Sequence, residues 1–262
     1  MPHVHVTPLE IARLRFDLTA AYALPPGHPA AGAPGLPVLA YHLALPRRSV
    51  LVDAPLYEAA STPDVYLLPG FVAPPPLPDQ LRAAGIEPAG VTDVVLSHAH
   101  FDHLGGLERR TEAGTVPTFP NARHYLGRGD WDPAAFTAMA REDLLTVERA
   151  GLLTLVDGDL DLGDGLSLVA APGESPGHQL VRAQAGDDVV YVAGDLYHHA
   201  IEFDESERNV RWVDAPAMRA SKEALLARAE REGARVYLSH IAGPHRVGGA
   251  ASARRLEPIA SR

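Results

Sequence analysis

Four side chains that can bind metal ions lie within the six-residue segment from His98 to His103. In an extended chain, alternate side chains share a face, so His98 and His100 can reach one ion. If the chain then turns into a helix, Asp102 and His103 can face a second ion. Imidazole and carboxylate groups are ligands of zinc, manganese and iron. The segment therefore predicts a two-metal site and, with it, a metal-dependent activity.

The elements around this segment predict the fold. An apolar run at 91–97 predicts a strand that leads into the segment, and runs at 36–45 and 50–53 predict a hairpin ending in Asp53. Further strands are predicted at 123–126, 152–156, 166–170, 180–183, 188–193 and 235–239, and helices at 79–84 and 216–232. Strands ending in Asp53 and Asp195 indicate a duplicated half. The pattern favours an α/β fold, with two mixed sheets packed face to face and helices outside.

Composition limits the class of protein. The 262 residues contain no cysteine, so disulfides and thiolate ligands are excluded, and His, Asp and Glu must hold any metal. The formal net charge is −10 and the arginine pairs are isolated, which disfavours nucleic acid as a partner. We expect one domain over residues 1–262 and no membrane span. The N-terminus lacks a secretory pattern, which predicts a cytoplasmic protein, and a homodimer is also considered.

The H-x-H-x-D-H pattern at 98–103 resembles the metal-binding motif of the metallo-β-lactamase superfamily. The resemblance also includes the hairpin that ends in Asp53, the segment 171–178, the acid Asp195 and the pair Ser239-His240. The early hairpin, Phe101 and the segment 194–199 are most similar to the lactonase and organophosphate-hydrolase-like branch. The resemblance implies a four-layer αββα sandwich and a metal-dependent hydrolase.

The resemblance also implies a role for each ligand. One ion would be held by His98 and His100, the other by Asp102, His103 and His240, and both by Asp195. A hydroxide between the two divalent ions would be the nucleophile. Asp102 would then carry the proton to the leaving group.

One position departs from the superfamily pattern P-G-H-x-x-G-H. Glu174 stands at the first histidine of that pattern, and His178 retains the second. Either Glu174 binds the first metal directly, or His178 binds it and Glu174 lies behind. We favour Glu174, because a carboxylate is a competent ligand for hard or borderline ions. We therefore expect a shift in preference from zinc toward manganese or iron.

Two other assignments have alternatives. Asp53 is expected to orient a ligand histidine, and its alternative is a simple turn residue. His240 fits the last ligand position better than His245, which is the alternative ligand. Asp195 could cap a helix, but its spacing from the other motifs favours bridging.

The residues after Asp195 are assigned by weaker signals. Tyr197 lies close to the position where lactonase-like relatives have a tyrosine that polarises the substrate carbonyl, although its offset from Asp195 differs. His198 and His199 could line the pocket, but we favour a partly exposed loop pair.

The leading hypothesis is hydrolysis of a small ester or lactone, with apolar loops at 67–78 receiving an acyl chain. The same fold and metal site support other chemistry, so three alternatives stay open. They are glyoxalase II-like thiolester hydrolysis, an oxygenase holding one iron, and a non-catalytic protein that binds a small metabolite beside a degenerate metal site.

Overall fold

The computed structural model describes residues 3–56, 64–112, 114–132, 138–204, 208–249 and 254–259. In chain order the strands are β1 (His5–Arg15), β2 (Gly35–Leu45), β3 (Arg48–Val52), β4 (Asp93–Val95), β5 (Glu108–Thr111), β6 (Gly114–Pro117), β7 (Arg123–Gly127), β8 (Leu153–Val156), β9 (Leu160–Gly163), β10 (Leu166–Ala170), β11 (Gln179–Ala185), β12 (Asp188–Val192), β13 (Arg235–Tyr237), β14 (His245–Gly248) and β15 (Arg255–Pro258). The helices are α1 (Leu18–Ala21), α2 (Leu77–Ala83), α3 (Phe101–Leu104), α4 (Ala138–Arg149), α5 (Ile201–Asp204) and α6 (Ala215–Glu232).

Two mixed sheets form the centre of the molecule. The six-stranded sheet has the order β1-β2-β3-β4-β7-β8, and the seven-stranded sheet has the order β15-β14-β13-β12-β11-β10-β9. In the first sheet, β3, β4, β7 and β8 run parallel, and in the second, β12 and β13 do. The remaining neighbours in both sheets are antiparallel. Each sheet therefore has a parallel pair whose strands end at the same edge.

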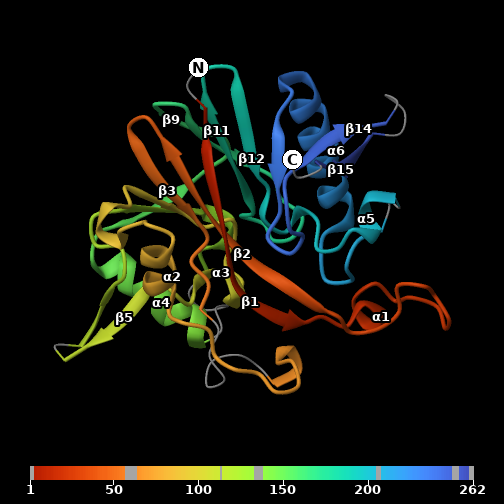
Figure 1. Cartoon of the computed structure of the whole chain (residues 1–262), viewed down its shortest axis with the longest axis horizontal. Coiled ribbons are helices and arrows are strands. Elements are labelled where there is room, and N and C mark those ends of the chain that lie inside the picture. Colours follow the sequence, from red (N-terminus) through yellow and green to blue (C-terminus); the bar gives the residue numbers. More distant parts are fainter. Residues whose placement is uncertain are drawn as a thin grey trace.

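Among the described residues the core comprises three apolar layers and a fourth cluster around α1 and the adjoining parts of β1 and β2. The layer between the sheets contains Leu43 and Val52 from the first sheet and Val181 and Val192 from the second. Outside the first sheet, α2 and α4 cover a second cluster, and outside the second sheet, α6 covers a third. Figure 1 shows α2 and α4 on one side of the molecule and α6 on the other. Four consecutive residues of β12, Val189–Val192, are buried and apolar, as expected for a strand covered on both faces.

Helix α6 has strong local signals at both ends. Asp214 is the N-cap, and its side chain accepts a hydrogen bond from the backbone N–H of Ala217 at 3.1 Å. Pro216 lies in the first turn, where its missing N–H costs nothing. Gly233 ends the helix with φ of +60°, a conformation that glycine adopts without strain. These signals place α6 within one residue of its predicted start.

The four layers agree with the sequence prediction, but the long edge strand β1 was not predicted. Pro8 and alternating charged residues interrupt its apolar pattern. Proline is tolerated there because β1 lies at the edge of its sheet, where not every backbone N–H needs a partner strand. The predicted strand at 91–97 is shorter than expected, because the chain leaves the sheet after Val95 to form the metal-binding segment.

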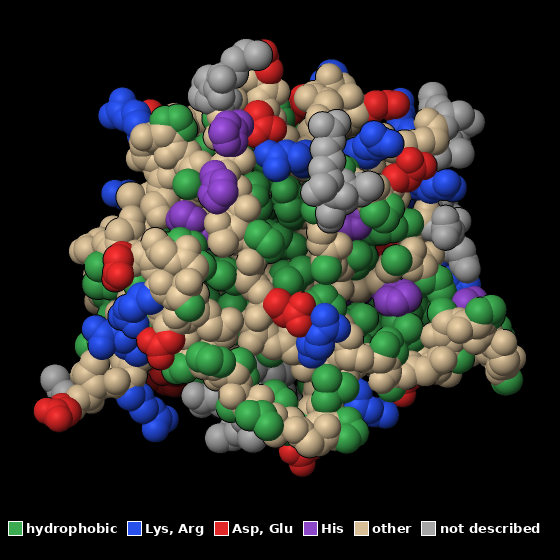
Figure 2. Space-filling model, viewed as in Figure 1, with side chains coloured by type: hydrophobic (Ala, Val, Ile, Leu, Met, Phe, Trp, Pro, Cys, Tyr) green, Lys and Arg blue, Asp and Glu red, His purple; other side chains and the backbone are tan. Residues whose placement is uncertain are grey.

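The described surface carries both signs of charge. On the face in Figure 2, lysine and arginine side chains lie interspersed with aspartate and glutamate among the described residues, rather than gathered in one basic area. Within the described part of the chain, no helix is both long and apolar enough to cross a membrane.

Candidate metal centre

The candidate metal centre lies where the parallel strands of both sheets end. Asp53 follows β3 and His98 follows β4, while Asp195 follows β12 and His240 follows β13. Because parallel neighbours end at the same edge, each sheet presents two of these side chains together. The sheets pack face to face, so the two pairs meet in one buried cluster.

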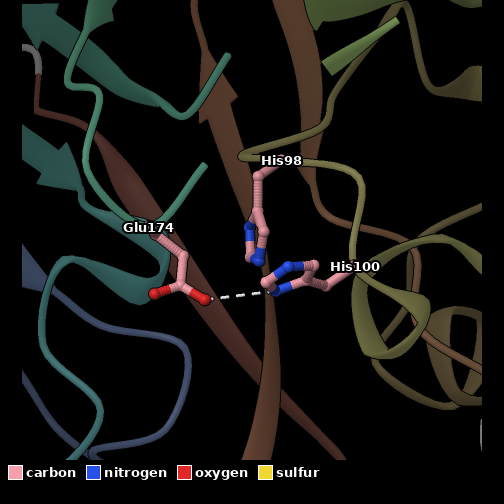
Figure 3. A group of neighbouring side chains, drawn as sticks. All are labelled: His98, His100 and Glu174. Carbon is pink, nitrogen blue, oxygen red and sulfur yellow. Dashed lines mark ion pairs between the residues drawn. The ribbon is translucent and has the colours of Figure 1, made fainter. Parts of the chain in front are cut away.

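Two ligand groups face each other across Asp195. Their members are His98, His100 and Glu174 on one side, and Asp102, His103 and His240 on the other. Nδ1 of His100 lies 3.2 Å from Oε1 of Glu174, and Figure 3 shows these side chains converging with His98 from two different loops. Nε2 of His240 lies 3.4 Å from Oδ2 of Asp102. The predicted ligands His98, His100, Asp102, His103, Glu174, Asp195 and His240 are all in this cluster.

Asp195 lies between the two groups. Its Oδ1 is 3.4 Å from Nε2 of His103, and its Oδ2 is 3.2 Å from Nε2 of His240. On the other side, Oδ2 is 3.9 Å from Nε2 of His98. These distances give Asp195 the position that a carboxylate shared by two ions would need.

Several ligand atoms are buried without a hydrogen-bond partner. They include Nε2 of His98, Nε2 of His103, Oε2 of Glu174 and Oδ1 of Asp195. Buried polar atoms are almost always paired, because an unpaired one costs desolvation free energy. Here the unpaired atoms point into one space from several elements. The residues therefore fit a pair of divalent cations bound among them.

The electrostatics of the cluster favour a cation. Burial opposes ionisation of Asp195, but His240 and His103 hold the pKa of this carboxyl well below its usual value. Burial alone would lower the pKa of His240, but Asp195 and Asp102 raise it to about 10. Burial, together with His103 and His100, lowers the pKa of His98 well below its usual value. The carboxylates are thus ionised and strongly attract positive charge, which metal ions can supply once the imidazoles are neutral.

Asp53 holds the first-sheet side of the centre in place. Its Oδ1 accepts a hydrogen bond from the backbone N–H of Ser97 at 2.7 Å. Its Oδ2 lies 3.0 Å from Oγ of Ser97 and 2.9 Å from Nδ1 of His103. The contact to Nδ1 leaves Nε2 of His103 directed at the cluster. This geometry is that of a carboxylate that orients a ligand histidine.

His178 and Glu174 occupy different places. Nδ1 of His178 donates to the backbone oxygen of Ala171 at 3.0 Å, and Nε2 accepts from the backbone N–H of Asp195 at 3.2 Å. Both ring nitrogens are therefore engaged by backbone groups. A side chain at Gly194, which has φ of +53°, would collide with His178. His178 thus supports the backbone of Asp195, while Glu174 reaches into the ligand cluster.

Two predicted residues lie outside the cluster. The ring of Tyr197 packs in the apolar layer beneath α6, 5.4 Å from the ring of Phe203, with the ammonium group of Lys222 4.7 Å from its centre. The ring of His245, in β14, packs 5.2 Å from the same Phe203. The structure does not bring either side chain to the ligand atoms of the groups described above.

Sequence reasoning missed one buried residue at the centre, Asp130, and the prediction that His198 lies in a partly exposed loop was wrong. Asp130 accepts hydrogen bonds from the backbone N–H groups of Ala99 and Gly177, at 3.1 and 2.6 Å, and so ties the two ligand-bearing loops together. His198 is 2% exposed on its side chain, and its Nε2 lies 3.2 Å from Oε2 of Glu174. The signal for His198 was its place three residues after Asp195, in the same turn.

A cavity of about 420 Å³ opens over the ligand cluster. Its polar floor contains His100, Asp102, Glu174, Asp195, His198 and His240, and its apolar walls contain Leu14, Phe16, Tyr66, Phe101 and Trp212. The indole N–H of Trp212 donates to Oε1 of Glu174 at 3.0 Å. The cavity therefore combines a polar floor with apolar walls.

Comparison with known proteins identifies the family. Residues 34–240 match the family model described as the metallo-beta-lactamase superfamily. The chain belongs to this superfamily. The resemblance inferred from the metal-binding motif is therefore confirmed.

Relatives of this superfamily member include named lactonases. N-acyl homoserine lactonase AttM of Azorhizobium caulinodans is 38% identical over 114 residues, which cover 38% of this chain and 38% of the relative. An N-acyl homoserine lactonase of Bacillus cereus is 27% identical over 155 residues, which cover 55% of this chain and 57% of the relative. The matches thus span only part of the relatives' length.

Solved structures share the fold over almost the whole chain. The hydrolase AbOPH has a TM-score of 0.79 at 17% identity, covering 99% of this chain and 95% of its own. AidC, a dizinc quorum-quenching lactonase, has a TM-score of 0.78 at 17% identity, covering 100% of this chain and 97% of its own. The likeness confirms the predicted four-layer αββα fold.

Proposed function

We propose that this protein is a metal-dependent hydrolase of lactones or small esters, with N-acyl homoserine lactones as the first substrates to test. The observation that carries the proposal is a set of unpaired, buried ligand atoms beneath a cavity with apolar walls. The named lactonases among the relatives support the choice of a lactone. The cavity volume suits a small molecule rather than a polymer.

Two divalent ions would be held by the residues already described. One would bind to His98, His100 and Glu174, the other to Asp102, His103 and His240, and Asp195 would contact both. Bound there, the ions would polarise a substrate carbonyl and lower the pKa of bound water. Zinc suits the imidazoles, and the additional carboxylate of Glu174 favours manganese or iron in the first position.

Asp102 is placed to move a proton. It lines the cavity, and its Oδ2 lies 3.4 Å from Nε2 of His240. Burial would raise the pKa of this carboxyl, but His103 and His240 hold it below its usual value, so Asp102 starts as a base. From the cavity floor it would accept a proton from the attacking water and deliver it to the alkoxide that leaves when the lactone ring opens.

The apolar walls would hold the part of the substrate that does not react. Phe16, Tyr66 and Trp212 also line a second hollow of about 490 Å³, so the apolar surface extends from the site into a neighbouring hollow. An acyl chain lying there would remove apolar surface from water, at about 25 cal/mol per Å². Affinity should therefore rise with acyl chain length.

The test is a substrate panel measured by proton release. We expect hydrolysis of N-acyl homoserine lactones, with KM falling as the acyl chain lengthens, and loss of turnover in the Asp102→Ala variant. The exposed acid Asp79, replaced by alanine, is the matched control. Faster hydrolysis of thiolesters than of any lactone, or full turnover in Asp102→Ala, would contradict the proposal.

A further inference from the structure

His198 has the burial and position of a metal ligand. Its side chain is 2% exposed, and Nε2 lies 3.2 Å from Oε2 of Glu174 and 3.6 Å from Oδ2 of Asp195. Neither Nε2 nor Oε2 of Glu174 makes a hydrogen bond, despite the short distance between them. One ligand atom each from Glu174, Asp195 and His198 lie within 4.8 Å of one another. The three ligand atoms are therefore gathered around one space, with Glu174 and His198 also at ion-pair distance from each other.

A buried acid, Glu202, lies behind His198. Glu202 accepts a hydrogen bond from the backbone N–H of His198 at 3.0 Å, and its Oε1 lies 3.6 Å from Nδ1 of the ring. The other oxygen of Glu202 is bonded to the ammonium group of Lys222, which is also buried. Tyr22 donates its hydroxyl hydrogen to Oε1. Glu202 is thus fixed from several directions, with the ring of His198 on its open side.

The order of these groups has a physical consequence. A buried Lys–Glu pair gains little net stability, because desolvation offsets the attraction between the charges. Here, however, Glu202 of this pair lies next to the imidazole of His198, whose Nε2 faces the ligand cluster. Histidines that bind metal ions usually have their other ring nitrogen next to a carboxylate or carbonyl, which fixes the ring. His198 also has a carboxylate beside its other ring nitrogen, since Oε1 of Glu202 lies 3.6 Å from Nδ1; this is an ion-pair distance, and Nδ1 itself makes no hydrogen bond.

The position of His198 also complements the departure at Glu174. In the superfamily pattern a histidine stands at position 174, and this chain has a carboxylate there. His198 brings an imidazole to the same part of the centre from the turn after β12. The first ligand group of His98, His100 and Glu174 thereby regains a third imidazole next to it.

We propose that Nε2 of His198 is a further ligand of the metal centre, acting with Glu174 and Asp195, and that Glu202 orients the ring. The proposal rests on the proposed function, since it requires metal ions in this centre. It assigns the segment after Asp195 a direct role in metal binding.

The test compares metal binding by His198→Gln and wild type. Metal-free protein is titrated with zinc against a competing chelator, and the visible absorption of the cobalt-loaded protein is recorded. We expect one of the two dissociation constants to rise by at least about 100-fold, beyond the range of about 10- to 100-fold that loss of an orienting partner causes. The cobalt bands should change in position or intensity. Glu202→Gln should raise the same constant by about 10- to 100-fold.

His199→Gln is the matched control. His199 is the next residue, is half-buried, and uses its ring nitrogen to accept a hydrogen bond from the backbone N–H of Ile201. This variant should bind both ions as wild type does. If His198→Gln fails to fold, a crystal structure of the zinc-loaded wild type decides instead, with Nε2 of His198 expected about 2.0–2.1 Å from an ion.

The outcomes separate the two proposals. If wild type binds no metal ions, the proposed function fails. If wild type binds two ions and His198→Gln binds them with the same constants and cobalt spectrum, the role of His198 as a ligand is refuted alone. Loss of turnover in His198→Gln with unchanged metal binding also refutes that role.

Discussion

Replacement of Asp53 by alanine should weaken both the fold and the metal centre. Asp53 is 1% exposed and accepts hydrogen bonds from the backbone N–H of Ser97 and from the Nδ1 side of His103. Alanine would leave these two buried donors unpaired, at about 1–3 kcal/mol each. Wild type already adopts φ of +61° at this position, so alanine changes the backbone cost only by losing the local polar contacts of aspartate. From the two buried donors, the free energy of unfolding should fall by about 2–6 kcal/mol.

Asp164→Ala is the matched control for the backbone cost. Asp164 also has positive φ, +52°, but its side chain is 38% exposed and only 3.6–3.9 Å from arginine nitrogens. Such surface ion pairs contribute about 0–1 kcal/mol. The difference between the two alanine variants therefore measures the buried donors at Ser97 and His103.

The assay is denaturant unfolding in the presence of a chelator, followed by zinc titration of the refolded protein. Because a loss of several kcal/mol can exceed the stability of a domain, Asp53→Asn serves as the milder variant. Asparagine tolerates positive φ and retains one acceptor, so it should lose about 1–3 kcal/mol. Zinc affinity should fall about 10- to 100-fold, because the ring of His103 is no longer fixed. Equal unfolding free energies for Asp53→Ala and Asp164→Ala, with unchanged zinc affinity, would refute the reasoning.

Three further predictions concern single residues. Burial and the nearby Glu108 raise the pKa of Asp143 from 3.8 to about 8 in the folded chain. Between these two pH values the unfolded chain has lost a proton that the folded chain keeps. The free energy of unfolding therefore falls as pH rises, by up to about 1.4 kcal/mol per pH unit. Asp143→Asn should remove this dependence. In urea unfolding, the free energy of unfolding of the variant minus that of wild type should therefore grow between about pH 5 and about pH 7.5. If this free-energy difference stays constant with pH, the raised pKa of Asp143 is contradicted. Tyr197→Phe should leave kcat unchanged, since the ring of Tyr197 packs beneath α6. A large fall in kcat would show that the Tyr197 hydroxyl is catalytic after all. Trp212→Phe should weaken zinc binding about tenfold, because it removes the hydrogen bond to Glu174 while keeping an aromatic side chain in the cavity wall. A change in KM with unchanged zinc affinity would contradict this prediction.

Local signals predicted much of the fold. The hairpin of β2 and β3 and helix α6 combine apolar runs with turn or cap residues, and both formed close to their predicted positions. The metal-binding segment was recognisable for the same reason, since its four ligands are close in sequence. By contrast, β1 was missed, because Pro8 and its charged residues hide an edge strand that only pairing with β2 stabilises.

Long-range relationships could not be predicted from spacing. Lys222 lies in α6 and Tyr22 just after α1, and only folding brings them to Glu202. The directions of Tyr197 and His198 depend on the tight turn after β12, which sends one ring under α6 and the other into the metal centre. The sequence analysis placed Tyr197 in the site and favoured a partly exposed loop for His198, and the structure reverses both positions.

The central claim is that metal ions bound in this centre drive hydrolysis of a lactone. The most direct test is to titrate metal-free protein with zinc while the rate of N-acyl homoserine lactone hydrolysis is measured. We predict no hydrolysis without metal and a rate that rises until two ions are bound per chain. Hydrolysis that persists in the metal-free protein, or a fully loaded protein that hydrolyses no lactone, would contradict the claim.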